Sequence, residues 1–431
     1  MKAQPQQDLV SFVEERQDRL ISLLRDIVRI PSENRAPFGA EEQCQRHIAE
    51  VLRRAGWEPV LYTPQDVPGM EQHPLFWPGR HYAGRPNVGA VRRGTGGGRS
   101  LVLSGHIDTV PAGSAPWTRA PFGAEVEGNR LYGRGANDMK AGIAANLFVA
   151  EALSELGIQL AGDLIFESVV DEEFGGVNGT LAGRLMGFNG DAAIISEPSS
   201  LRISPAQRGG RTLDITFTSG NTGILSAGPA AGAIDQLRTF LDALPGFAAL
   251  RRSTAPRHAL YTHLENPVPV TVARIQTAPW GTSEPPNVPA ECRLQLFWQT
   301  MPGETVEEID AQFHEWFREL LRRNPEIFRE GPQLAHPIRW LPGSAIAADH
   351  PFVSDFSASV ASTLGNRAAI AGIEGPCDMY AFHEFGIPAL LWGARGGNTH
   401  MPDEYVEIDS LVQSVKALLA FVCSWCGGKV R

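Results

Sequence analysis

From Leu101 to Val110 the chain reads LVLSGHIDTV, an apolar run with the pattern of a buried strand that breaks at Gly105. The run delivers His106 and Asp108, whose side chains point the same way if the segment stays extended. A histidine can bind a metal ion through one ring nitrogen while a neighbouring carboxylate holds the other N–H and fixes the tautomer. This stretch therefore predicts a strand end that carries a metal-binding histidine, with Asp108 orienting it.

Three more segments place a carboxylate directly after a turn or a strand-like run. They are YGRGANDMKAG with Asp138, LIFESVVDEE with Glu172 and Glu173, and AAIISEP with Glu197. Far downstream, His400 follows another strand-like run, ALLW. In open α/β sheets the functional site lies outside the carboxyl ends of the strands, so we expect these side chains to converge on one place.

Acidic side chains gathered in this way repel one another unless a cation neutralises them. Burying an unpaired carboxylate costs several kcal/mol, which a bound metal ion would offset. Oxygen ligands together with imidazole favour zinc, manganese or cobalt over a thiolate type of site. The sequence therefore predicts a site for divalent cations built from carboxylates and histidines.

Together the motifs resemble the dinuclear metallohydrolase family that includes acetylornithine deacetylase, succinyl-diaminopimelate desuccinylase, aminoacylase and carboxypeptidase G. The resemblance covers nearly the whole chain and rests on five separated motifs in the family's order. These are the His-x-Asp strand end, the Gly-x-x-Asp-Met-Lys-x-Gly turn, the Glu-Glu pair, the Ser-Glu-Pro segment and the late histidine. The resemblance implies a metal-dependent hydrolase of C–N bonds, with an N-acyl amino acid or a small peptide as its default substrate.

The resemblance also implies two divalent ions, zinc or manganese with cobalt as a further option, and a set of five ligands. The ligands are the bridging Asp138, His106 and Glu197 for one ion, and Glu173 and His400 for the other. Glu172 would be the general base, which must lie beside the ions without being consumed as a ligand. The family pattern further predicts a cis peptide bond between Asp138 and Met139.

The length of 431 residues favours more than one domain. After Pro205 the pattern changes to two βαβ-like passes, which predict a small split βαβ sandwich. We therefore expect an α/β fold, with a mixed-sheet catalytic domain at 1–206 and 343–431 and an inserted α+β satellite of ferredoxin-like type at 207–342. In the resembling family the satellite commonly carries the dimer contact, so a homodimer or higher homo-oligomer is expected.

The composition limits which binding partners and which cellular location we expect. The formal net charge of −10 argues against nucleic acid and leaves a small molecule as the expected partner. Five cysteines form an odd, scattered set, which favours a reducing compartment over a disulfide framework. The N-terminus lacks the apolar core of a signal peptide, and we expect no run to span a membrane. These features predict a cytoplasmic location.

The satellite is where this sequence departs from the family pattern. Many members carry a histidine there that steadies the tetrahedral oxyanion, and Leu225 stands in its place. Two other family positions are altered, at Gln299 and at Tyr380, where an arginine is common. Losing one oxyanion donor typically costs about 100- to 1,000-fold in rate, so the departure bears on function.

Three interpretations of this departure remain open. In the first, another side chain supplies the missing donor, and the candidates are Asn287, Arg208, Arg211, His258 and His263. In the second, the enzyme hydrolyses a different C–N bond, for example in the hydrolytic deamination of an aromatic amine by metal-bound hydroxide. In the third, the protein is a catalytically silent metal-binding protein. Arg395 could additionally contact an anionic group of the substrate, and Asp378 or Glu404 could support the metal ligands.

Overall fold

The computed structural model describes residues 4–220, 232–278 and 287–430 and divides the chain into two compact units. The larger unit comprises Met1–Ala206, Ala345–Ile373 and Cys377–Arg431. The inserted unit comprises Gln207–Ser344 together with Glu374–Pro376. The insertion had been expected at 207–342.

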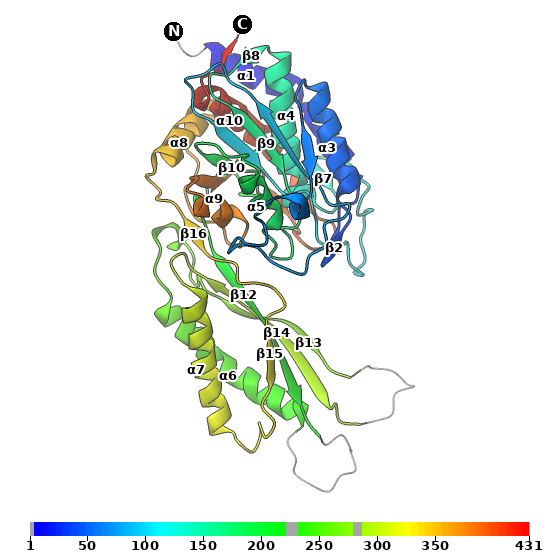
Figure 1. The fold of residues 1–431 in the computed structure, drawn as a ribbon, viewed down its shortest axis with the longest axis vertical. Coiled ribbons are helices and arrows are strands. Elements are labelled where there is room, and N and C mark those ends of the chain that lie inside the picture. The colour runs from blue at the N-terminus through cyan, green and yellow to red at the C-terminus, as the bar shows by residue number, and fades with distance from the viewer. Residues whose placement is uncertain (1–3, 221–231, 279–286, 431) are drawn as a thin grey trace. The chain divides into compact units, whose positions relative to one another are not determined.

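A mixed sheet that includes β9 and β10 forms the centre of the larger unit (Figure 1). It has six strands, in the order β17-β10-β5-β9-β4-β3. The strands are β3 (Val60–Tyr62), β4 (Asn87–Arg92), β5 (Leu101–Ser104), β9 (Leu164–Ser168), β10 (Ala193–Ile195) and β17 (Ala389–Leu391). Strands β17, β10, β5 and β9 run parallel, β4 is antiparallel to β9, and β3 is antiparallel to β4. The parallel strands therefore end at the same edge of the sheet.

Helices cover both faces of this sheet. Alternate residues of a strand point to opposite faces, and Leu101 and Leu103 accordingly belong to one buried cluster while Val102 belongs to another. The first cluster packs under α1 (Gln4–Glu15), α2 (Gln17–Val28), α3 (Glu42–Arg54), α4 (Ala141–Glu155), α8 (Pro351–Leu364) and α10 (Ile408–Trp425). The second packs under α5 (Asn178–Leu185) and α9 (Met379–Glu384).

Helix α10 corrects one expectation from the sequence. No run was expected to be long and apolar enough to span a membrane, yet the window Ile408–Trp425 reaches a mean hydropathy of 1.3. In the structure 72% of this window is buried. The helix packs against α8, α1 and α4, so its apolar surface belongs to the core of the larger unit.

The inserted unit is a four-stranded antiparallel sheet packed against two helices. Its elements are β12 (Gly209–Thr218), α6 (Ala233–Thr254), β13 (Val270–Gln276), β14 (Glu291–Thr300), α7 (Val306–Arg323) and β15 (Gln333–Ala335). The strand order β13-β14-β12-β15 and the chain order βαββαβ are those of a split βαβ sandwich. The predicted ferredoxin-like satellite is therefore confirmed. Its core is rich in aromatic residues, including Phe217, Phe240, Phe247, Trp298 and Phe313.

Shorter elements complete the fold. They are β1 (Asn34–Arg35), β2 (Phe38–Gly39), η1 (Pro64–Asp66), β6 (Glu125–Glu127), β7 (Arg130–Tyr132), η2 (Ala136–Lys140), β8 (Ile158–Gln159), β11 (Ala206–Gln207), η3 (Ala259–Tyr261), β16 (Ser344–Ala345), β18 (Gly396–Gly397), β19 (Tyr405–Glu407) and β20 (Lys429–Val430). A second, antiparallel sheet of the larger unit has the order β18-β19-β7-β6. It links the turn that carries Asp138 to the segment that carries His400.

Candidate active site

The predicted metal ligands come together in the larger unit. His106 follows β5, Glu173 follows β9 and Glu197 follows β10, and these strands are neighbours that end at the same edge of the sheet. Asp138 lies in the turn η2 directly before α4, and His400 follows β18. Residues nearly 300 positions apart in the chain thus meet at one site.

Asp138 lies between the two histidines. Its Oδ1 is 3.1 Å from His106 Nε2, and its Oδ2 is 3.3 Å from His400 Nε2. His106 Nε2 is also 3.4 Å from Glu197 Oε1, and His400 Nε2 is 2.9 Å from Glu173 Oε2. Each oxygen of Asp138 therefore faces a different histidine, and each histidine faces a second carboxylate.

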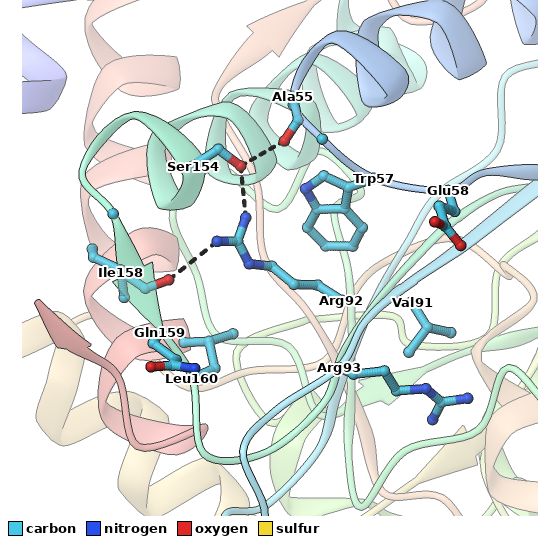
Figure 2. Close-up of a pocket in the computed structure, with 12 residues that line it drawn as sticks. Ala55, Trp57, Glu58, Val91, Arg92, Arg93, Ser154, Ile158, Gln159 and Leu160 are labelled. Carbon is cyan, nitrogen blue, oxygen red and sulfur yellow. Dashed lines mark hydrogen bonds between the residues drawn. The ribbon is translucent and has the colours of Figure 1, made fainter. Parts of the chain in front are cut away.

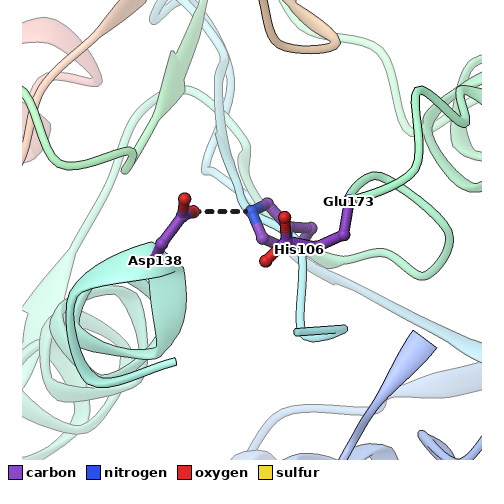
Figure 3. Close-up of side chains that lie close together, drawn as sticks. All are labelled: His106, Asp138 and Glu173. Atoms are coloured by element: carbon purple, nitrogen blue, oxygen red, sulfur yellow. Dashed lines mark hydrogen bonds and ion pairs between the residues drawn. The ribbon is translucent and has the colours of Figure 1, made fainter. Parts of the chain in front are cut away.

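The grouped side chains fit a site for a divalent metal ion. One ligand atom from each of His106, Asp138 and Glu173 can be chosen so that all three lie within 4.8 Å of one another (Figure 3). Ligands about 2.0–2.1 Å from a tetrahedral zinc ion are about 3.3 Å apart, close to the distances between the facing atoms. Nitrogen and oxygen donors without a thiolate suit zinc, manganese or cobalt.

The electrostatics of the site also favour cations. Burial raises the pKa of Glu197 to about 7 and raises that of Glu173. Burial lowers the pKa of His400, but hydrogen bonds to Asp138 and Glu173 outweigh it and raise that pKa to about 11. Glu173, Glu197 and His400 thus favour their protonated forms, the two glutamates chiefly because burial disfavours their negative charge. Divalent ions would take the place of those protons.

Glu172 lies beside the ligands. Its Oε2 is 3.8 Å from His106 Nε2, longer than the distances from that nitrogen to Asp138 and Glu197. Burial, together with the charges of Glu197 and other nearby carboxylates, raises the pKa of Glu172 well above its ordinary value. A carboxyl group with a raised pKa can both accept and return a proton near neutral pH.

Asp108 differs from its predicted role in detail. His106 Nδ1 is 2.9 Å from the backbone carbonyl oxygen of Asp108 and 3.6 Å from its carboxylate. The imidazole is therefore oriented by the carbonyl, with Nδ1–H as the donor. The carboxylate instead accepts hydrogen bonds from the backbone N–H groups of Glu172, at 3.0 Å, and Glu173, at 3.1 Å.

Glu404 stabilises the backbone of the turn that carries Asp138. The carboxylate of Glu404 accepts hydrogen bonds from the backbone N–H groups of Gly135, Asn137 and Asp138 at 3.0–3.1 Å. Gly135 has φ +79°, a conformation that favours glycine. The predicted cis peptide bond between Asp138 and Met139 is confirmed.

Three of the candidate substrate-binding residues lie in the inserted unit with their side chains engaged there. Arg208 donates to the carbonyl oxygens of Glu374 and Pro267, and Gln299 also donates to that of Glu374. Arg211 forms a bidentate ion pair with Asp310 at 2.6 and 2.9 Å. These contacts give the three side chains structural partners within their own unit.

The remaining candidates fall in different surroundings. Asn287 is exposed, and Leu225 lies outside the described residues. Tyr380 is buried in α9 against Val177. Arg395 donates to Glu407 at 3.0 Å and lies 3.7 Å from Asp409, so carboxylates of the larger unit already face its guanidinium. The roles predicted for these residues in substrate binding remain predictions.

The fold and the site together define a class of protein, the hydrolases that act on C–N bonds. The model of peptidase family M20/M25/M40 matches residues 102–424, which is most of the chain. The chain belongs to this family. The resemblance inferred from the five sequence motifs is therefore confirmed.

Two curated relatives show the chemistry found among similar chains. An N-formyl-4-amino-5-aminomethyl-2-methylpyrimidine deformylase from Halalkalibacterium halodurans is 28% identical over 444 residues, covering 97% of each chain. The acetylornithine deacetylase of Salmonella typhimurium is 28% identical over 342 residues, covering 79% of this chain and 83% of that one.

Solved structures share the fold. The di-peptidase Dug1p from Saccharomyces cerevisiae has a TM-score of 0.79 at 15% identity, with 99% of both chains covered. The Bacillus subtilis YXEP protein, described as a dinuclear metal binding peptidase from the M20 family, has a TM-score of 0.58 at 18% identity. The match covers 96% of this chain and 99% of that one.

Proposed function

We propose that the protein hydrolyses the amide C–N bond of a small N-acylated substrate and that Glu172 is the general base. The observation that carries the proposal is the placement of Asp138 between His106 and His400, with Glu172 adjacent to the ligand set. A general base must lie within reach of the reacting water while staying free of the ligand positions.

The proposed roles divide among the side chains of the site. Asp138, His106 and Glu197 would hold one ion, and Asp138, Glu173 and His400 the other. When bound, the two ions would supply Lewis-acid polarisation of the scissile carbonyl and lower the pKa of water. Glu172 would take a proton from that water and return it to the nitrogen that leaves. Its raised pKa suits both steps.

The substrate class is proposed from the relatives. The deformylase relative acts on an N-formyl group of an aminomethylpyrimidine and the deacetylase on acetylornithine, as their names state. Both names describe removal of a small acyl group from an amine. We extend this class to the present chain and keep N-acyl amino acids and small peptides as the default. The metal would be zinc or manganese, with cobalt as a further option.

The proposal is tested by substituting Glu172 with glutamine. Glu172→Gln keeps the shape of the side chain but removes its basicity, so turnover should fall by at least about 100-fold, the lower bound for general-base catalysis. Release of formate, acetate, free amino acids and ammonia should be measured from N-formyl-4-amino-5-aminomethyl-2-methylpyrimidine, acetylornithine, dipeptides and aromatic amines, respectively. The protein should be loaded in turn with zinc, manganese and cobalt.

The outcomes separate three functions. Acyl release that is lost in Glu172→Gln supports the proposal, with the exposed Glu384→Gln as a matched control that keeps full activity. Ammonia release from aromatic amines alone would point to deamination instead. A metal-loaded protein without turnover on any of these compounds would point to a catalytically silent metal-binding protein.

We also propose a homodimer formed through the inserted unit and a cytoplasmic location. The family resemblance supports the first, and the five free cysteines support the second. Light scattering on the purified protein would test the first, because one chain has a mass of 46.7 kDa and a dimer twice that mass. Fractionation of the native host would test the second.

A further inference from the structure

The loop that carries Glu172 and Glu173 has an unusual backbone. Asp171 has φ +67°, in the left-handed region that a residue other than glycine adopts only when its surroundings hold it there. Gly176 closes the loop, and a Cβ atom there would lie 1.6 Å from the carbonyl oxygen of Asp171. The chain therefore turns back on itself within six residues. The direction of both glutamate side chains depends on this turn.

The backbone of the two glutamates is fixed by a single carboxylate. Asp108 accepts hydrogen bonds from the N–H groups of Glu172 and Glu173, and Asp108 is fully buried. A displacement of the Asp108 carboxylate would thus move a metal ligand and the general base together.

Asn34 joins this carboxylate to Asp171. Its Nδ2 donates to Asp108 Oδ2 at 2.9 Å and to Asp171 Oδ1 at 3.3 Å, and its backbone N–H donates to the carbonyl of Thr109 at 2.8 Å. Asn34 is fully buried, and its Oδ1 has no hydrogen-bond partner within the described part of the chain. The orientation of the amide is therefore decided by its two carboxylate partners, because the flipped amide would turn its oxygen toward them.

Asp171 is held on its other side by groups from one distant segment. Tyr82 donates its hydroxyl to Asp171 Oδ2 at 2.6 Å, and Arg80 and Arg85 lie 3.7 and 3.6 Å from Oδ1. These cations offset the cost of burying two carboxylates beside one amide. The loop is thus fastened to β1 through Asn34 and to residues 80–85 through Asp171.

We propose that Asn34 and Asp171 are positioning residues that hold the backbone of Glu172 and Glu173 at the metal site. The catalytic part of this proposal rests on the proposed function, in which Glu172 is the general base. The structural part, that Asn34 and Asp171 hold the backbone of the loop, does not depend on that function. Neither residue contacts the reacting atoms. Both act through Asp108 and the turn of the loop.

The test compares Asn34→Leu with the wild-type protein by hydrogen–deuterium exchange and by kinetics. Leucine keeps a branched side chain of similar size but removes both hydrogen bonds. We expect the amides of Glu172 and Glu173 to exchange at least about tenfold faster while those of α4 and β9 keep their protection. On a substrate that the wild type hydrolyses, we expect kcat to fall about 10- to 100-fold with KM unchanged, because a small displacement of a base acts on the chemical step. The affinity for the ion assigned to Glu173 should fall as well, because the same hydrogen bonds hold the backbone of that ligand.

Two further variants keep the test decisive. Arg35→Gln alters the exposed neighbour of Asn34 and should leave exchange and kinetics unchanged. Asp171→Asn serves if Asn34→Leu does not fold. It keeps the shape of the loop residue but weakens its attraction to Arg80 and Arg85, so the amides of Glu172 and Glu173 should again exchange faster. Unchanged exchange of those amides in a folded variant would overturn the proposal. If the amides of Glu172 and Glu173 exchange faster in the variant but the wild type hydrolyses none of the substrates, the positioning role is supported. That result would count against the proposed function alone.

Discussion

At the scale of single residues, Asp138 decides what the site can hold. Each of its oxygens faces a histidine, and each histidine faces a further carboxylate. A carboxylate whose two oxygens face different histidines can bridge two neighbouring ions. Glu404 supports this arrangement by accepting three backbone hydrogen bonds from the turn around Asp138.

Metal uptake should release protons, because the ligands carry them when no ion is bound. The pKa of Glu197 is raised to about 7 and that of His400 to about 11. Below these values a proton must leave before the ligand atom can bind, so metal affinity should rise as the pH rises from about 6 to 8. Titration calorimetry in buffers of different ionisation enthalpy should show about one or more protons released per ion. An affinity that does not change over this range would contradict the assignment of these ligands.

At the scale of the elements, the close approach of α4 to the end of β10 sets the spacing of two ligands. A Cβ atom on Gly142 would lie 1.9 Å from the carbonyl oxygen of Ser196. Asp138 precedes α4 and Glu197 follows Ser196, so a wider spacing there would separate two ligands of the same ion.

Gly142→Ala should therefore weaken both the fold and one metal site. We expect the free energy of unfolding to fall by about 1–3 kcal/mol or more, because the clash is with backbone. The affinity for one of the two ions should also fall. Urea denaturation and metal titration would measure these effects. Gly331→Ala, where an added Cβ atom meets nothing within 4 Å, is the control. Wild-type affinity for both ions in Gly142→Ala would show that this contact does not set the spacing.

The strand ends could be predicted from the sequence because their signals are local. An apolar run followed by His106 or Glu197 reveals a strand that ends in a ligand, and the split βαβ pattern of the inserted unit is likewise visible in the order of its elements. The roles of Asn34 and Asp171 could not be predicted in this way. Asn34 meets Asp108 across 74 positions of the chain, and no local pattern reports such a contact.

The same limit affected the candidate substrate contacts. Arg211 was considered as a replacement oxyanion donor and Arg395 as a contact for an anionic substrate group, but Asp310 and Glu407 already pair with them. Their partners lie 99 and 12 positions away, so a charge considered alone in the sequence looked available.

At the scale of the whole molecule, the candidate metal site lies in the larger unit. All five predicted ligands and Glu172 lie in it, and the inserted unit is built around an aromatic core of its own. The central claim is therefore a claim about this one unit, namely that two divalent ions bind between the side chains gathered at the edge of its sheet.

Counting and locating the metal in the purified protein tests this claim most directly. Elemental analysis should give about two divalent ions per chain, and anomalous diffraction should place both beside Asp138, about 3.5–4 Å apart. His106→Ala and His400→Ala should each remove one ion, and not the same one. A protein that contains no such ions and takes up none on titration, or one whose ions lie away from Asp138, would contradict the account.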